Sequence, residues 1–341
     1  MLIDIARVIS HFVRLRDGRN APALIQQEDR MGLLINGQWQ DNWYDTAKTE
    51  GAFKRESAQF RNAISLESDA RFPAEKGRYH LYVSLACPWA HRTLLFRQFK
   101  KLENYIGLSI VHPHMLEQGW EFKAEMGATG DHLYGLRYLY ELYCKADPHY
   151  SGRVTVPVLW DKKEETIVSN ESAEIIRQFN QVFNHLTGDK QDFYPAALRA
   201  EIDAINDKIY NAVNNGVYKC GFATRQEAYE LAFYELFKVL DELDIHLSRH
   251  DYLVGGQLTE ADWRFFTTLI RFDAVYFSHF KTNQRRISDY PALQPYLHKL
   301  YHYPGVRETV NFLHIKQHYY FSHKTINPSQ IVPVGPKLDF E

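Results

Sequence analysis

The fold is decided by residues 79–89, which read Tyr-His-Leu-Tyr-Val-Ser-Leu-Ala-Cys-Pro-Trp. The first seven of these residues alternate in character, and such alternation favours a β-strand. Pro88 has the fixed φ that suits the first turn of a helix, and an apolar pattern at helical spacing follows it as far as Phe99. The segment therefore predicts a strand that leads into a helix, with Cys87 at the junction.

Cys87 is the candidate nucleophile of the chain. At a helix N-terminus its sulfur would face unpaired backbone N–H groups, whose partial positive charge favours the thiolate. The alternative is a buried and inert cysteine, against which the strand, the Cys-Pro pair and the amphipathic helix argue together. Position 90 is alanine where a dithiol oxidoreductase carries its second cysteine, so this motif cannot close an internal disulfide. The sequence therefore predicts mixed-disulfide chemistry with a small thiol.

The elements after this first helix complete a known order. Apolar runs predict strands at 106–111 and 154–159 and a hairpin partner at 164–168, and a helix is expected over 169–180. The predicted order is strand, helix, strand, a longer connection, two strands and a helix. This is a thioredoxin-like layout. We expect this layout to span residues 79–187.

Pro157 lies inside the strand expected over 154–159, where proline is normally excluded. In a thioredoxin-like fold, a cis-proline at this place bends the backbone beside the active cysteine. The bend exposes the N–H and C=O of the preceding residue, Val156, to a peptide ligand. An edge strand with a trans-proline is the alternative.

A carboxylate site is expected where Ser169-Asn170-Glu171-Ser172 starts the next helix. Backbone N–H groups and the Ser172 hydroxyl can bind a carboxylate there, and Glu171 can bind an ammonium group. Taken alone, such a run is a common helix-capping motif and does not indicate a ligand. Its place after a Val-Pro strand and a hairpin is where a thioredoxin-like protein binds the γ-glutamyl end of glutathione.

The strand patterns stop after residue 187. Apolar residues recur at helical spacing over 233–247, and the whole of 195–320 is expected to form helices joined by loops. Thr259 and Asp262 form a capping pair that predicts a helix start. The fold class is therefore α/β plus all-α, a thioredoxin-like N-terminal domain followed by an all-helical C-terminal domain.

The chain divides accordingly into four stretches. Residues 1–16 favour an amphipathic helix, with an organelle-targeting peptide as the alternative, and Met31 is an alternative start. The expected stretches are an N-terminal extension and irregular lead-in at 1–78, the thioredoxin-like domain at 79–187, the all-helical domain at 195–321 and an extended tail at 322–341.

Composition and charge exclude several classes of function. Forty basic and 42 acidic side chains leave a net charge of −2, so no global basic field predicts nucleic-acid binding. No run of about 18 uninterrupted apolar residues occurs, so no membrane span is expected. Three cysteines, Cys87, Cys144 and Cys220, cannot form a disulfide framework, which indicates a reducing compartment and a cytoplasmic protein. The His-Pro-His run at 112–114 is expected to be a surface turn, and no metal is expected.

Six segments together resemble one known family. The first three are Cys87-Pro88-Trp89-Ala90-His91-Arg92, Val154-Thr155-Val156-Pro157-Val158-Leu159-Trp160-Asp161 and Ser169-Asn170-Glu171-Ser172-Ala173-Glu174-Ile175-Ile176. They strongly resemble the glutathionyl-hydroquinone reductases, the Xi class of glutathione transferases. Residues 214–223, 271–276 and 323–328 look like that class and not like transferases in general. The resemblance covers nearly everything from Met31 to Pro336.

The resemblance implies a glutathione-transferase fold, a homodimer and glutathione as co-substrate. The implied activity is the reduction of S-glutathionyl-hydroquinones, through a Cys87-glutathione mixed disulfide that a second glutathione resolves to oxidised glutathione. Glutathione would be held by Trp120, Arg153, Val156, Glu171 and Ser172. The hydroquinone pocket would be lined by Tyr218, Tyr276 and Tyr319, with Tyr320 as the neighbouring alternative to Tyr319.

Two other functions remain as alternatives. A transferase that conjugates glutathione to electrophiles would carry Ser or Tyr at position 87, to stabilise the thiolate of glutathione. A scaffolding module is the second alternative, since such folds do not fix function. Reduction of dehydroascorbate and deglutathionylation of proteins can accompany the main activity, because the same mixed disulfide would serve. Either Tyr218 or Tyr319 is expected to hydrogen-bond the ring oxygen or to deliver a proton to the departing ring.

Overall fold

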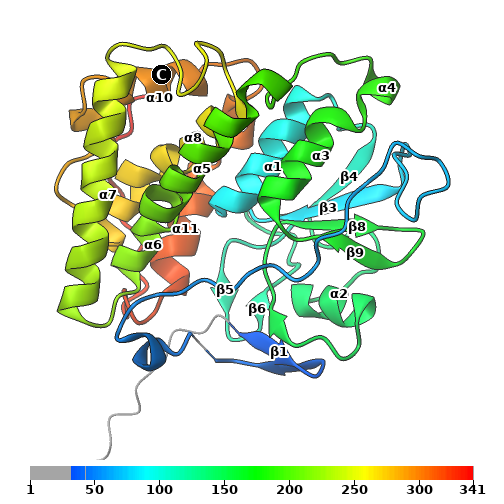
Figure 1. Ribbon diagram of the computed structural model, residues 1–341. Coiled ribbons are helices and arrows are strands. Elements are labelled where there is room, and N and C mark those ends of the chain that lie inside the picture. Colours follow the sequence, from blue (N-terminus) through cyan, green and yellow to red (C-terminus); the bar gives the residue numbers. More distant parts are fainter. Residues whose placement is uncertain (1–31, 43, 341) are drawn as a thin grey trace, which may run out of the picture.

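The computed structural model describes residues 32–42 and 44–340 of the chain (Figure 1). The amphipathic helix expected over 1–16 and the alternative start at Met31 lie outside these residues. A four-stranded sheet with helices on both faces forms one part of the molecule, and a group of helices packs beside it (Figure 1).

The sheet carries the expected thioredoxin-like layout. Its strands are β3 (Tyr79–Val83), β4 (Ile106–Ile110), β8 (Val158–Asp161) and β9 (Thr166–Ser169), in the order β4-β3-β8-β9. β3 and β4 are parallel, because α1 (Pro88–Phe99) carries the chain back between them, and the other two pairs are antiparallel. α1 and α3 (Ser172–Gln181) lie on one face and α2 (Leu139–Ala146) on the other (Figure 1). The prediction for this half of the fold is confirmed.

Two elements begin later than the sequence predicted. The strand expected from residue 154 begins only at Val158, because Pro157 has no N–H to give to a sheet ladder. The Val156-Pro157 bond is cis, as expected. The helix expected from Ser169 begins at Ser172, because Ser169 is still paired with Leu159 in the sheet.

The lead-in is more regular than predicted. β1 (Leu33–Ile35) and β2 (Gln38–Gln40) form a hairpin, and β1 also pairs with β7 (Gly152–Arg153). The hairpin turns at Asn36-Gly37, whose φ angles of 49° and 73° are those that a two-residue hairpin requires. The expectation of an irregular segment is therefore wrong for 33–40, because strands of three residues are too short to show a period. Further short elements are η3 (Thr46–Thr49), β5 (Met115–Leu116) and β6 (Gly119–Trp120).

From Asn184 onward the described chain forms helices joined by turns and loops. The α-helices are α4 (Asn184–Thr187), α5 (Arg199–Ile209), α6 (Gly216–Gly221), α7 (Gln226–Leu247), α8 (Glu260–Arg271), α9 (Phe277–His279), α10 (Leu293–Tyr301) and α11 (Phe312–Ser322). Two π-helical segments, η5 (Tyr210–Asn214) and η6 (Phe272–Tyr276), continue α5 and α8. The 3-10 helices are η4 (Ala196–Leu198), η7 (Ile287–Asp289) and η8 (Arg307–Thr309). α8 is buried along its whole length. It starts with the predicted capping pair, in which the Thr259 N–H donates to Asp262 Oδ2 at 2.8 Å.

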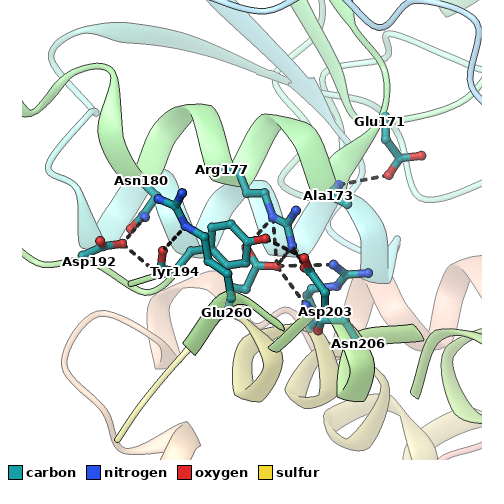
Figure 2. A network of polar contacts seen from close by, with 11 residues as sticks. Glu171, Ala173, Arg177, Asn180, Asp192, Tyr194, Asp203, Asn206 and Glu260 are labelled. Atoms are coloured by element: carbon teal, nitrogen blue, oxygen red, sulfur yellow. Dashed lines mark hydrogen bonds and ion pairs between the residues drawn. The ribbon is translucent and has the colours of Figure 1, made fainter. Parts of the chain in front are cut away.

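A polar network joins the sheet half of the molecule to the helical half (Figure 2). Arg177 on α3 donates from Nε to both carboxylate oxygens of Glu260 on α8, each at 3.1 Å. The same guanidinium also pairs with Asp203 on α5, and Asn206 donates to Glu260 at 2.9 Å. The Glu260 side chain is buried, so these donors supply the partners that water would otherwise provide.

After α11 the chain runs without regular secondary structure. The Phe340 ring near its end packs against Tyr301 and Phe312. Within the part of the chain that the structure describes, no helix combines the length and the hydropathy needed to cross a bilayer. Residues 79–187 and 195–321 remain our proposed limits for the two domains.

Candidate active site

Cys87 lies where the strand-helix junction was expected, at the N-cap of α1. Its Sγ accepts a hydrogen bond from the Ala90 N–H at 3.5 Å and donates to the carbonyl oxygen of Val156, also at 3.5 Å. Val156 is the residue before the cis-proline. The nucleophile predicted from one segment therefore meets the backbone that was predicted, from another, to bind a peptide.

The electrostatic environment of Cys87 differs from the expectation. Burial raises the pKa of the Cys87 thiol above its usual value. The N–H groups of Ala90 and Trp89 and the cations Arg271 and Arg55 lower that pKa, but by less than burial raises it. The helix N-terminus therefore favours the thiolate, as expected, but the loss of water around the sulfur opposes it more strongly.

One part of the active-site cleft is polar and lies at the start of α3. Val156, Glu171 and Ser172 line it, and it encloses about 1190 Å³, part of it open to solvent. Glu171 caps α3 by accepting from the Ala173 N–H at 3.0 Å (Figure 2). The buried Ser172 hydroxyl has no hydrogen-bond partner among the described residues. A buried hydroxyl without a partner at a helix N-terminus suits a ligand with a carboxylate.

The second part of the cleft is mostly apolar and contains Cys87. It encloses about 740 Å³, again partly open. Its walls include Trp39, Phe53, Trp120, Tyr218, His318 and Tyr319. Both parts share the side chains of Arg55, Trp89, Arg153, Thr155 and Val156, so they adjoin. Cys87 therefore lies beside the border between a polar site and an aromatic one.

The three tyrosines of the expected quinone pocket form one hydrogen-bonded cluster. The Tyr276 and Tyr319 hydroxyls are 3.0 Å apart, and Tyr218 and Tyr319 are also hydrogen-bonded. Tyr218 and Tyr319 line the apolar cavity, whereas Tyr276 is fully buried behind them and does not. Tyr320 turns elsewhere and bonds Ser278. Burial raises the pKa of all three clustered phenols, which keeps them protonated.

The structure places Trp120 and Arg153 differently from the other expected glutathione residues. Trp120 lines the apolar part of the cleft and stacks on His318, with ring centroids 4.8 Å apart. Arg153 borders both parts, and its guanidinium lies 4.1 Å from the Tyr44 ring centroid. Of the five expected glutathione residues, Arg153, Val156, Glu171 and Ser172 therefore line the polar part, and Trp120 does not.

Several cleft residues were not singled out from the sequence. Arg55 stacks on Trp89, with its guanidinium 3.7 Å from the ring, and donates to Asn215 at 3.2 Å. It comes from the lead-in, where no motif marked it. His318 and His323 line the apolar cavity, and the only signal was that His323 belongs to one of the quoted segments.

The other residues considered from the sequence, His112, His114, Cys144 and Cys220, do not line the active-site cleft. His114 bonds Gln317 at 2.9 Å and stacks on Phe321. Within the described residues, no three His, Cys, Asp or Glu side chains come together as a metal site. Cys144 lies on α2, where its Sγ donates to Gly37, and the buried Cys220 lines neither part of the cleft.

Comparison with known families identifies both halves of the chain. Residues 86–182 match the glutathione S-transferase N-terminal domain, and residues 226–299 match its C-terminal domain. The chain is 57% identical over 318 residues to the glutathionyl-hydroquinone reductase YqjG of Escherichia coli, which covers 91% of this chain and 97% of that protein. It is 52% identical to the glutathionyl-hydroquinone reductase PcpF of Sphingobium chlorophenolicum, covering 90% of this chain and 96% of that one.

Solved structures give the same relationship. A Xi-class glutathione transferase from Natrialba magadii superposes with a TM-score of 0.85 and 48% identity, covering 92% of this chain and 95% of that one. The glutathione-bound structure of YqjG superposes with a TM-score of 0.83 and 53% identity, covering 91% and 97%. The chain therefore belongs to the glutathionyl-hydroquinone reductases, the Xi class of the glutathione S-transferase family.

Proposed function

We propose that this protein uses glutathione to reduce S-glutathionyl-hydroquinones to hydroquinones, with Cys87 as the nucleophile. The observation that carries the proposal is the position of Cys87. Its sulfur contacts the Val156 carbonyl at the polar part of the cleft and lines the cavity that Tyr218 and Tyr319 border. A sulfur at this place can reach the bond that joins glutathione to an aromatic ring.

The first step forms a disulfide and breaks a carbon-sulfur bond. The Cys87 thiolate attacks the glutathione sulfur of the substrate, and the pair of electrons of the broken bond stays on the ring carbon. That carbon takes up one proton, so the hydroquinone leaves and the enzyme keeps a Cys87-glutathione disulfide. Tyr218 or Tyr319 supplies the proton or hydrogen-bonds the ring oxygen, because burial keeps both phenols protonated.

The second step restores the enzyme. The thiolate of a second glutathione attacks the glutathione sulfur of the mixed disulfide. Oxidised glutathione leaves, and Cys87 returns as a thiolate. Each turnover thus joins the glutathione carried by the substrate and one free glutathione into oxidised glutathione, and one cysteine is enough.

Glutathione is proposed to lie across the polar part of the cleft. The Val156 backbone binds its cysteinyl portion, and Ser172 with the first N–H groups of α3 binds the γ-glutamyl carboxylate. Glu171 binds the ammonium group with the oxygen that does not cap the helix. Arg153 and Trp120 complete the site nearer the sulfur, in keeping with their places along the cleft.

The assembly and the location are also proposals. We infer a homodimer from membership of the family, and a reducing, cytoplasmic compartment from the three cysteines, which are free thiols here. The mass in solution, measured by light scattering, tests the dimer. A single species at 40.0 kDa would contradict it.

The decisive experiment follows two products by chromatography. Wild type, Cys87→Ala and the control Cys144→Ala each receive excess glutathione and a glutathionyl-hydroquinone. Wild type and Cys144→Ala should release hydroquinone and oxidised glutathione in equal amounts, and Cys87→Ala should release neither while it still binds glutathione. If wild type binds glutathione but forms neither product, the reductase activity is excluded, and conjugation and scaffolding become the functions to test.

A further inference from the structure

Arg271, the last residue of α8, holds the loop that carries Cys87. Its Nε donates to the Ala86 carbonyl at 2.8 Å, and its Nη2 donates to the Leu85 carbonyl at 3.1 Å. Leu85 and Ala86 are the two residues that precede Cys87. The guanidinium therefore fixes the backbone immediately before the nucleophile, from a helix of the other half of the molecule.

The same guanidinium also fixes the helix after Cys87. Its Nη1 donates to Thr267 on its own helix at 2.7 Å and lies 3.0 Å from Nδ1 of His91 on α1. The other ring nitrogen of His91 lies 2.8 Å from the Thr309 hydroxyl. Arg271 thus contacts the chain on both sides of Cys87.

The charge of Arg271 is not balanced by a carboxylate. The side chain is fully buried, and no acidic residue within 32–42 or 44–340 forms an ion pair with it. Its acceptors are three carbonyl oxygens and an imidazole. Arg264, about two helix turns earlier on α8, shows the contrast, because it pairs with Glu260. Burying a charge without a counter-ion is costly, so such a charge calls for an anion in its surroundings.

The groups that can become anions near Arg271 belong to the active site. They are the Cys87 thiol itself and the phenols of Tyr218 on α6 and Tyr276 on η6, which face it. The cations that face Cys87 are Arg55 from the lead-in and Arg271. Burial and Arg271 hold the pKa of His91 well below its usual value, so its imidazole is neutral. The positive charge of Arg271 lowers the pKa of Cys87, and it acts in the same direction on Tyr276 and Tyr319.

We propose that Arg271 is a positioning residue of the reaction, which orients Cys87 through the Leu85 and Ala86 carbonyls and offsets the negative charge that forms on its sulfur. This inference rests on the proposed function, in which a thiolate forms before the first attack and returns after the second. The charge matters because burial disfavours negative charge on the sulfur and Arg271 acts against it. The helical half of the molecule thereby contributes to the nucleophile as well as to the quinone cavity.

The test compares three variants of an enzyme that carries Cys144→Ala and Cys220→Ala, so that only Cys87 reacts. Arg271→Gln removes the charge, and Arg271→Lys keeps it but cannot hold both carbonyls. Arg97→Gln is the matched control, because Arg97 on α1 also donates to two carbonyls, those of Ile106 and Glu103. It lies ten residues along the helix from Cys87, about 15 Å away. The readouts are the pH midpoint of Cys87 alkylation by iodoacetamide, and kcat and KM.

The expected results separate charge from orientation. Arg271→Gln should raise the alkylation midpoint by about one pH unit and lower kcat at pH 7 roughly tenfold, with KM for glutathione little changed. Arg271→Lys should keep the midpoint near that of wild type but lose turnover, because the loop is no longer held. Arg97→Gln should alter neither the midpoint nor kcat.

Two results would overturn the proposal. One is an unchanged alkylation midpoint in folded Arg271→Gln, and the other is a shift in Arg271→Lys as large as in Arg271→Gln. If Arg271→Gln does not fold, Arg271→Lys alone decides, since full turnover or a midpoint raised by a unit contradicts the proposal. Alkylation needs no quinone substrate, so a failure of the reductase assay would leave this measurement intact and count only against the proposed function.

Discussion

The sulfur of Cys87 lies 3.5 Å from the carbonyl oxygen of Val156, although 69 positions separate the two residues in the sequence. The contact joins the start of α1 to the backbone before the cis-proline.

Tyr319→Phe should slow the release of hydroquinone. The change removes the hydroxyl that Tyr218 and Tyr276 both contact, and with it the chain of phenols that can deliver a proton. We expect kcat to fall roughly a hundredfold, the lower end of what a general acid contributes, with KM for glutathione unchanged. Steady-state kinetics of hydroquinone formation measure both. Tyr320→Phe is the control and should stay close to wild type, because the Tyr320 hydroxyl bonds Ser278 and does not line the cavity. Equal losses in both variants would place the proton donor elsewhere.

Ser172→Ala should weaken glutathione binding without destabilising the fold. The Ser172 hydroxyl is buried and unpartnered among the described residues, so its removal costs the protein no hydrogen bond. A lost hydrogen bond to a carboxylate is worth about 1.5 kcal/mol or more, so the dissociation constant should rise roughly tenfold. Calorimetric titration and thermal unfolding provide the two readouts. Ser109→Ala is the comparison. It should destabilise the fold without changing glutathione affinity, because Ser109 is hydrogen-bonded to His80 and lines neither part of the cleft. Unchanged glutathione affinity in Ser172→Ala would exclude this site.

Acid should destabilise the protein below about pH 6.5, because buried histidines stay neutral in the fold. Burial lowers the pKa of His80 to about 4 and that of His318 to about 4. Between about pH 6.5 and about pH 4 the unfolded chain binds these protons and the native chain does not. The free energy of unfolding should therefore fall as the pH falls, by about 1.4 kcal/mol per pH unit for each such histidine.

Urea unfolding at a series of pH values measures this slope. His80→Gln should flatten it by roughly the share of one histidine. The exposed His302 gives the control, and His302→Gln should leave the slope unchanged. A stability that does not vary over this range would show that the buried imidazoles do not resist protonation.

Arg177→Met should destabilise the contact between the two halves of the molecule. It leaves the buried Glu260 with only Asn206 and the more distant Arg264 as donors. Removing one partner of a buried pair costs about 3–5 kcal/mol, and because Arg177 is about a third exposed we expect about 2 kcal/mol. Arg61→Met is the comparison, because its pair with Glu174 is more exposed and should cost under about 1 kcal/mol. If both variants lose the same free energy of unfolding in urea, the burial of Glu260 does not set the strength of its ion pair.

Much of the site could be predicted because its parts are local in sequence. Pro88 after Cys87 fixes a helix start, and Pro157 after Val156 marks a break in a strand, whatever surrounds them. The boundaries were less exact: β8 and α3 begin four and three residues later than predicted. β8 begins only after Pro157, which has no N–H for the ladder, and α3 begins only after Ser169 has paired with Leu159. A periodic pattern reports neither effect.

Neighbouring residues and periodicity were enough to predict the order of elements, the cysteine at a helix N-terminus and the absence of a second cysteine beside it. The packed fold was needed to show that burial raises the pKa of Cys87, because desolvation sums over every atom packed around the sulfur. It also decided which of Tyr319 and Tyr320 faces the cavity, and it brought Arg271 to Ala86 across 185 positions. Such contacts arise from the packing of whole helices against one another, and no local stretch of sequence encodes them.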